Sequence, residues 1–324
     1  MKVGVFSAIL SGLPLEQALA HVAGLKCDTI EIGTGAFPGN AHCKPDELLA
    51  SEGKLKEFQA AIAQSGLEIS SLSCHGNPIH PDAALAREHH EVFQATVKLA
   101  AKIGVDVVTT FSGCPGDGSP GAKYPNWVTC PWPPDFLKIL DHQWNEVAIP
   151  YWKEQTKFAA DHGIKKVALE AHPGFLVYNP ETMLRLRDAT SPVLGSNFDP
   201  SHFFWQGIDP VMAVRKLGAA GAIHHVHAKD TGLSKVNADY DGYLDTKPYT
   251  DELNRAWIFR TVGYGHGAEF WTNFVSALRM VGYDGTLSME HEDSLMSPNE
   301  GLRKGVEFLQ GIILRDARGE VTWA

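Results

Sequence analysis

Short apolar runs alternate along the chain with longer segments in which apolar residues recur every three to four positions. The short runs are rich in Val, Ile and Thr and predict β-strands, whereas the longer segments predict amphipathic helices. We predict eight strands, at 3–8, 28–33, 68–73, 105–112, 165–170, 193–199, 222–228 and 286–292. Helices are predicted at 15–24, 46–65, 82–104, 145–163, 180–189, 210–218, 268–281 and 299–317.

The order of these elements predicts the fold class. Several strands are nearly all apolar, as parallel strands covered on both faces should be. Four strands follow a helix that reaches a glycine, in AHVAGLKCD, IAQSGLEIS, AAKIGVDVV and AADHGIKKV, and glycine readily takes the left-handed conformation that ends a helix. Eight strand–helix units without a change in composition predict an α/β fold, a single (β/α)8 TIM barrel that spans residues 1–324.

Two long loops interrupt this rhythm, at 112–144 and 230–266. Both follow predicted strands, so both are expected on the C-terminal face of the barrel, where loops shape the substrate pocket. The first holds six prolines and three tryptophans, and aromatic residues disfavour the alternative of a disordered insert.

Composition narrows the classes of function. The chain has 324 residues, of which 44% are apolar, and this is enough for a large core. Its net charge of −10 disfavours binding to nucleic acid. No run of 18 apolar residues predicts a membrane span. The five cysteines form no C-x-x-C pair, which favours reduced thiols in a cytoplasm over disulfides or a zinc ribbon.

Ionisable residues gather near the ends of the predicted strands. They are Glu31, His75, Glu170, His172, Asp199, His202, His225, His227, Glu290 and Glu292. In a barrel these ends meet at one mouth, where the chemistry takes place. Because a buried, unpaired carboxylate is costly, several carboxylates at one mouth predict a shared cation.

Alternation along the strands selects the metal ligands. In the seventh strand His225 and His227 share the inward face, and His224 points the other way. His227 lies nearer the strand end and is the predicted ligand. His225 is expected either to line the pocket wall or to contact the metal ligands. Glu290 is preferred to Glu292 because it is closer to the apolar part of its strand. The predicted ligands are Glu170, Asp199, His227 and Glu290.

Three carboxylates and one imidazole suit one divalent metal ion. Mn²⁺ is the first choice, with Co²⁺, Mg²⁺ or Zn²⁺ as alternatives. Four protein ligands leave positions open on an octahedral ion, and two neighbouring oxygens of a substrate can fill them. The competing interpretations are structural: Glu170 as a helix cap, and Asp199 as the start of a helix at Pro200.

The strand-end series LEAHP, NFDPSH, HVHAKD and SMEHED resembles the xylose-isomerase-like TIM-barrel superfamily, in its sugar phosphate isomerase/epimerase branch, over essentially the whole chain. In that family a Glu, an Asp, a His and a Glu from four strands bind one divalent metal, at positions that match the four predicted ligands. By the same likeness Glu170 and Glu290 are the catalytic acid and base, and His202 contacts the substrate. The stretch AKDTGLSK departs from ketose 3-epimerases and is more like the inosose-dehydratase and uncharacterised branches.

The predicted activity is that of a sugar or keto-sugar isomerase or epimerase. A metal that holds a carbonyl and its neighbouring hydroxyl stabilises an enediolate, so carboxylates can remove and return a proton. The sequence has no phosphate-binding glycine loop, which favours an unphosphorylated polyol or keto-sugar. The alternatives are a metal-dependent lyase or dehydratase on a keto-inositol or 3-keto-glycoside, an AP-endonuclease-like DNA-repair enzyme with three metals, and a barrel that only binds.

Further residues are expected around the pocket. The candidates for contact with substrate are Glu31, His75, His172 and Arg260, of which Arg260 has bracing of its loop as an alternative role. Lys229 and Asp230 are predicted to form an ion pair that holds His227. The expected partner is a small sugar or polyol, without nucleic acid or membrane, and formation of a homo-oligomer is left open.

Overall fold

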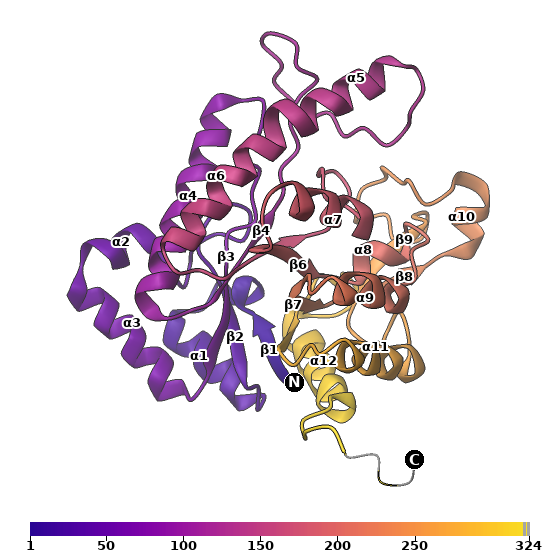
Figure 1. Cartoon of the computed structure of the whole chain (residues 1–324). Helices are drawn as coiled ribbons and strands as arrows, with labels where there is room; N and C mark the ends of the chain where they lie inside the picture. The colour runs from indigo at the N-terminus through magenta and orange to yellow at the C-terminus, as the bar shows by residue number, and fades with distance from the viewer. Residues whose placement is uncertain (320–321, 323–324) are drawn as a thin grey trace.

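A computed structural model describes residues 1–319 and 322, and its strands close into a parallel eight-stranded barrel with helices around it (Figure 1). The barrel strands are β1 (Lys2–Phe6), β2 (Thr29–Gly33), β3 (Glu68–Ser73), β4 (Val107–Phe111), β5 (Lys166–Glu170), β6 (Leu194–Phe198), β7 (Ile223–Ala228) and β10 (Thr286–Met289). Each pairs with the next in this order, and β10 closes the barrel against β1. The predicted (β/α)8 barrel is confirmed.

Helices cover the outside of the barrel and also occur in the two long loops. They are α1 (Leu15–Gly24), α2 (Pro45–Ala50), α3 (Glu52–Ser65), α4 (Ala83–Ile103), α5 (Asp135–Asp141), α6 (Ile149–Asp161), α7 (Pro180–Ala189), α8 (Ser201–Phe204), α9 (Pro210–Ala219), α10 (Lys235–Asp241), α11 (Ala268–Met280) and α12 (Pro298–Ile312), with a 3-10 turn η1 (Ser7–Leu10). In α12, for example, Leu302, Val306 and Leu309 follow the helical repeat and are buried. No helix in the described part of the chain is both long and apolar enough to cross a bilayer.

Three predicted helices differ from those observed. The helix predicted at 46–65 is divided at Ser51, whose extended backbone starts α3 and whose hydroxyl accepts a hydrogen bond from Lys54 N at 3.3 Å. The helix predicted at 145–163 begins at Asp135, because α5 continues through a π-helical segment, η2 (His142–Ala148), into α6. The helix predicted at 299–317 ends at Ile312. The capping at Ser51 and the π-helical segment η2 therefore set helix boundaries that the apolar repeat does not predict.

The glycine stops are present in three of the four predicted places. Gly66, Gly104 and Gly163 have φ values of 74°, 79° and 86°, in the left-handed region. Gly24 instead lies inside α1, and Lys26 takes the left-handed conformation two residues later, with φ 59°.

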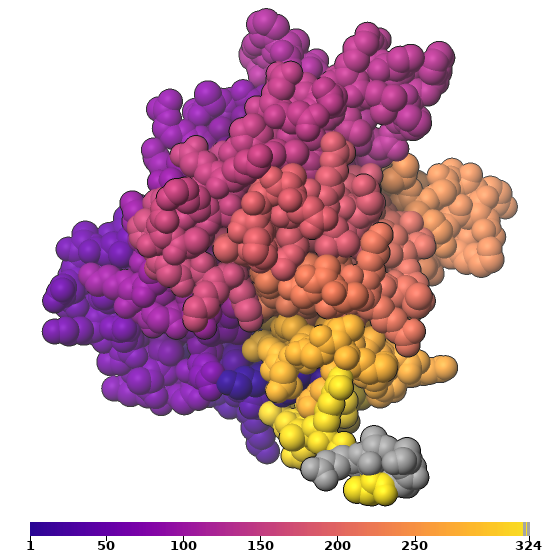
Figure 2. Space-filling model, viewed as in Figure 1, coloured from indigo at the N-terminus to yellow at the C-terminus, as the bar shows by residue number. Residues whose placement is uncertain are grey.

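The two long loops contain secondary structure of their own. Residues 230–266 hold an antiparallel pair, β8 (Asp230–Leu233) and β9 (Trp257–Arg260), with α10 between them. Residues 112–144 end in α5 and the start of η2. Figures 1 and 2 show that the α5 and α10 segments project from the body of the molecule. Both insertions follow barrel strands, as predicted.

Asp230 ties the two ends of the second insertion together. Its carboxylate is fully buried. It accepts hydrogen bonds from the backbone N–H groups of Thr231, Gly263, Gly265 and His266 and from the side chains of His266 and Trp271, at 2.8–3.2 Å. The predicted ion pair between Lys229 and Asp230 is therefore wrong, because Asp230 faces the insertion and Lys229 has other partners.

Candidate active site

Four polar side chains meet at the carboxyl end of the barrel. Glu170 is the last residue of β5, and His227 is next to last in β7. Asp199 and Glu290 directly follow β6 and β10. Each offers one ligand atom, and these atoms all lie within 4.8 Å of one another. The structure thus brings together the four residues predicted as metal ligands, which we call the carboxylate–histidine cluster.

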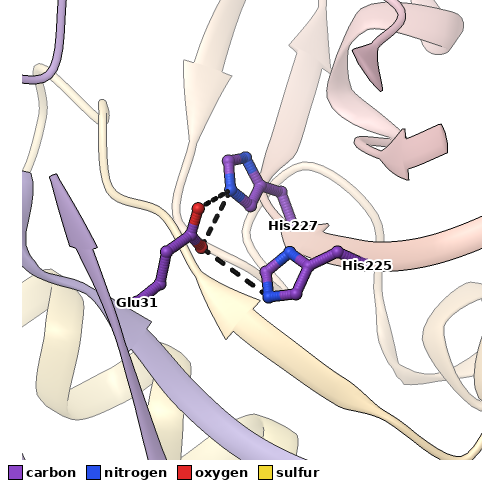
Figure 3. Close-up of side chains that lie close together, drawn as sticks. All are labelled: Glu31, His225 and His227. Atoms are coloured by element: carbon purple, nitrogen blue, oxygen red, sulfur yellow. Dashed lines mark hydrogen bonds and ion pairs between the residues drawn. The ribbon is translucent and has the colours of Figure 1, made fainter. Parts of the chain in front are cut away.

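His227 lies at the centre of this cluster. Its Nδ1 is 3.1 Å from Glu170 Oε2 and 3.0 Å from Glu290 Oε2. On the other edge of the ring, Nε2 is 3.0 Å from both carboxylate oxygens of Glu31 (Figure 3). The ring also stacks on Phe6, with 5.4 Å between centroids. One nitrogen therefore faces the other predicted ligands, and the second faces a carboxylate inside the barrel.

Lys229 supplies positive charge to the cluster. Its buried Nζ lies 3.1 Å from Asp199 Oδ2 and 2.9 Å from Glu290 Oε2. The same atom is 3.1 Å from Glu292 Oε2 and sits over the ring of Phe259. Alternation along the strand did not predict this role. It places Lys229 on the same face as His227, but it does not show how far the long side chain reaches.

The cluster retains unused coordination capacity. Within the described residues, Asp199 Oδ2, His227 Nδ1 and Glu290 Oε2 are buried and have no partner in hydrogen-bonding geometry. They approach oppositely charged groups only as ion pairs. Unpaired buried polar atoms are costly, and three carboxylates with one imidazole form a ligand set suited to a divalent cation. The residues present therefore fit such an ion.

The charges in the cluster shift its pKa values. Burial alone would raise the carboxylate pKa values, but the neighbouring histidines hold the pKa of Glu170 well below its usual value. Lys229 and the histidines likewise lower the pKa values of Asp199 and Glu290. Burial would lower the pKa values of His227 and Lys229, but the surrounding carboxylates raise both. The metal-free cluster is thus a network of full charges at neutral pH.

Three further histidines surround Glu170. His75 Nε2 lies 3.1 Å from Glu170 Oε2, and His202 Nε2 lies 3.1 Å from Glu170 Oε1 and from Asp199 Oδ2. Burial would lower the pKa of His202, but Asp199 raises it to about 9. The ring of His172 is 4.1 Å from that of His202, and burial lowers the pKa of His172 to about 3. His202 is therefore cationic at neutral pH, and His172 is neutral.

The other two predicted substrate contacts lie elsewhere. Glu31 is inside the barrel beneath the cluster and is fully buried. Arg260 lies on β9, where its Nε donates to Asp293 Oδ2 at 3.1 Å and its guanidinium sits over Tyr264. Arg260 is absent from the described residues that line the two cavities below, which favours its alternative role as a brace for the insertion.

Two cavities open beside the cluster. One, of about 240 Å³, is lined by His172, Tyr249, Ile258, Phe259, Glu292 and Ser294. The other, of about 270 Å³, is lined by Phe6, Ala8, Phe37, Pro38, His75, Phe111, Glu170, Glu290 and Glu292. Glu292 lines both, so the cavities adjoin at this half-exposed side chain.

Sequence reasoning missed most of the cavity walls. Glu292 was set aside as a ligand, and it lies instead at the mouth as a partner of Lys229. Phe111 ends β4, and Tyr249 and Phe259 belong to the second insertion. The aromatic content of that insertion is the one signal in the sequence that pointed to the last two.

Comparisons with known proteins match nearly the whole chain. The family described as xylose isomerase-like TIM barrel matches residues 19–312. Among curated proteins, the uncharacterised protein YfiH of Bacillus subtilis (strain 168) is 44% identical over 97% of this chain and 99% of its own length.

Solved structures of low identity share the fold. The IOLI protein, solved with a bound zinc atom, is 18% identical, covers 97% of this chain and 98% of its own, and superposes with a TM-score of 0.67. A D-tagatose 3-epimerase-like protein is 22% identical, covers 96% of this chain and 98% of its own, and has a TM-score of 0.63. Both are similar to this chain along nearly its whole length.

Proposed function

Because the chain belongs to the xylose isomerase-like TIM barrel family, we propose that it is a divalent-metal-dependent isomerase or epimerase of a sugar or keto-sugar. The observation that carries this proposal is the carboxylate–histidine cluster, with four ligand atoms within 4.8 Å of one another at the mouth of the barrel. The fold shared with a D-tagatose 3-epimerase-like protein and with a zinc-binding protein supports it.

Four residues would hold the metal, and they are Glu170, Asp199, His227 and Glu290. We propose Mn²⁺, with Co²⁺, Mg²⁺ or Zn²⁺ as alternatives, because oxygen donors predominate in this set. When bound, such an ion supplies Lewis-acid stabilisation of the negative charge that develops on neighbouring substrate oxygens.

The protein itself would move the protons. Glu170, at the end of β5, and Glu290, just after β10, both reach His227 Nδ1, and in the proposed reaction one of them removes the substrate proton and the other returns it. Their lowered pKa values favour the carboxylate that acts as a base. His202 is cationic at neutral pH, and its Nε2 lies 3.1 Å from Glu170; its Nδ1, which has no hydrogen-bonding partner within the described residues, is the atom we propose to donate to a substrate oxygen.

The cavity walls favour a neutral substrate. Phe6, Phe37 and Phe111 line one cavity, and Tyr249 and Phe259 line the other. Such rings pack well against the C–H faces of a sugar. Neither Lys nor Arg is among the described residues that line these cavities, whereas Glu292 adds negative charge to both. A phosphorylated sugar would meet repulsion here.

Activity should depend on metal and conserve the mass of the substrate. With Mn²⁺, we expect turnover of at least one member of a panel of unphosphorylated keto-sugars, inososes and 3-keto-glycosides, and EDTA should abolish it. The Glu290→Gln variant should lose about 10²–10⁴-fold in kcat, as expected for a general acid or base. Glu300→Gln, an exposed carboxylate on α12, is the matched control.

Mass spectrometry of the product decides between the candidate reactions. An unchanged mass supports isomerisation or epimerisation, whereas loss of water or of an aglycone would establish the lyase or dehydratase. The AP-endonuclease alternative predicts three metal ions per chain instead of one. If no substrate in the panel gives EDTA-sensitive turnover, the proposed function is wrong.

Metal binding should release a proton. The carboxylates around His227 raise its pKa well above its usual value, so the metal-free protein holds a proton that must leave before Nδ1 can bind a metal. At pH values below the pKa of His227, the association constant for Mn²⁺ should rise about tenfold per pH unit. Calorimetry with Mn²⁺ in two buffers that differ in ionisation enthalpy should report release of about one proton near pH 7. A pH-independent association constant would contradict the role of His227 as a ligand.

A further inference from the structure

A second layer of polar side chains lies beneath the carboxylate–histidine cluster, inside the barrel. It consists of Glu31, Ser70, Ser73, Asn197, His225 and Ser288, from strands β2, β3, β6, β7 and β10. Figure 3 shows Glu31 reaching across the barrel toward His225 and His227. The proposed reaction uses none of these six residues as a ligand, acid or base, so their arrangement in the barrel needs another explanation.

Glu31 is saturated with donors. It is fully buried, and the hydroxyl of Ser73 donates to Oε1 while that of Ser288 donates to Oε2, the latter at 2.6 Å. His227 Nε2 lies 3.0 Å from both oxygens. Burial would raise the pKa of Glu31, but the two histidines lower it to about 2. Because hydroxyl groups already donate to both carboxylate oxygens of Glu31, these oxygens act as acceptors, and His227 donates a hydrogen bond to them from Nε2.

This contact determines which nitrogen of His227 is free. A neutral imidazole carries one N–H and one lone pair. With the N–H on Nε2, the lone pair is on Nδ1, which faces Glu170 and Glu290 at 3.1 and 3.0 Å. Nδ1 is also the buried nitrogen that lacks a hydrogen-bonding partner within the described residues.

The hydrogen bonds of the other side chains in this layer also have defined directions. Asn197 Nδ2 donates to Glu170 Oε2 at 3.0 Å, so its Oδ1 faces His225 Nδ1, at 2.9 Å. His225 therefore donates from Nδ1, and its Nε2 accepts from Ser70 Oγ at 3.3 Å. Each donor in this layer meets an acceptor, and both branches end on a predicted ligand, one on His227 and one on Glu170.

We propose that Glu31 is a positioning residue, which fixes His227 in the Nε2–H tautomer and so presents Nδ1 to a divalent cation. This inference rests on the proposed function, because it requires the cation at the cluster. A second cation between Glu31, His225 and His227 fits less well. Both oxygens of Glu31 already accept hydroxyl hydrogens, and His225 Nε2 accepts from Ser70.

Two substitutions of Glu31 separate the effect of its hydrogen-bond direction from the effect of its charge. Glu31→Gln keeps the size of the side chain and can turn an amide N–H toward His227, which favours the opposite tautomer. Glu31→Asp keeps the charge but withdraws it from Nε2. Both should weaken Mn²⁺ and Zn²⁺ binding about 10–100-fold, measured by competition with a fluorescent chelator. Ser288→Ala removes one hydrogen bond from Glu31 but leaves its contact with His227, and should cost less than about tenfold.

NMR provides a second measurement, which does not depend on the affinity for metal. Long-range ¹H–¹⁵N spectra of Zn²⁺-loaded wild type should show His227, assigned from the His227→Gln variant, with its proton on Nε2. This measurement stands even if a Glu31 variant does not fold, which thermal melting would reveal. A proton on Nδ1 would overturn the proposal.

The outcomes distinguish this inference from the function beneath it. If wild type binds neither metal, the proposed function falls and this inference falls with it. If wild type binds metal and both Glu31 variants bind it equally well, only the positioning role is wrong. If wild type binds two ions and Glu31→Gln binds one, Glu31 is a ligand and the positioning role is again overturned.

Discussion

The His227→Ala variant is expected to lose divalent-metal binding, with a dissociation constant at least about 100-fold above that of wild type. His227 contributes the nitrogen of the predicted ligand set and contacts two of the carboxylates through Nδ1. Without it the remaining carboxylates keep contacts with Lys229, His202 and His75, but they lose the nitrogen ligand at the centre of the cluster. Titration calorimetry with Mn²⁺, together with metal content after dialysis, measures the effect.

His224→Ala is the matched control. His224 lies on the same strand, but its ring points to the opposite face, beside Gly195 of β6, and metal binding should be unchanged. His227→Ala also leaves Glu31 buried without its Nε2 donor, which is expected to cost about 3–5 kcal/mol of stability. His227→Gln retains an N–H for Glu31, so loss of metal binding in this folded variant isolates the ligand role. Equal metal content in wild type and both variants would refute that role.

The Asp230→Ala variant is expected to lower the free energy of unfolding by about 3–5 kcal/mol. The substitution removes the acceptor shared by the backbone N–H groups of Gly263, Gly265 and His266 and by Trp271 Nε1. These donors would remain buried in whole or in part without a partner, and each such group is costly. Urea denaturation followed by circular dichroism measures the change.

Asp239→Ala provides the comparison within the same insertion. Asp239 is exposed on α10 and pairs with Lys235 alone among the described residues, so its loss should change stability by less than about 0.5 kcal/mol. Similar denaturation midpoints for Asp230→Ala and wild type would show that the insertion is held by other contacts.

The barrel and the clustering of the four predicted ligands were predictable because both follow from short-range patterns. Strands buried on both faces read as apolar runs, and the two-residue repeat decides which side chains face inward. It therefore separates His224 from His225 and His227 without any knowledge of the fold. The parallel order of the strands then places Glu170 and Asp199 beside His227 at one end of the barrel.

The contacts across the barrel could not be read in this way. Glu31 and His227 are 196 positions apart in the chain, and their contact depends on the length and rotamer of two side chains. The sequence therefore suggested Glu31 as a residue of the pocket but did not reveal its contact with His227. The partners of Lys229 and Arg260 could not be predicted for a similar reason, because the reach of a long side chain depends on which neighbours pair with it.

The carboxylate of Asp230 makes residues 231–262 leave and rejoin the barrel at nearly the same point. A segment whose ends are already held together can change in length or be replaced at little entropic cost. Tyr249 and Phe259, which line a cavity, belong to this segment, whereas Glu170, Asp199 and Glu290 lie outside it. This segment, which forms part of the cavity wall, is therefore a transplantable cassette, and exchanging it would reshape the cavity while leaving the carboxylate–histidine cluster in place.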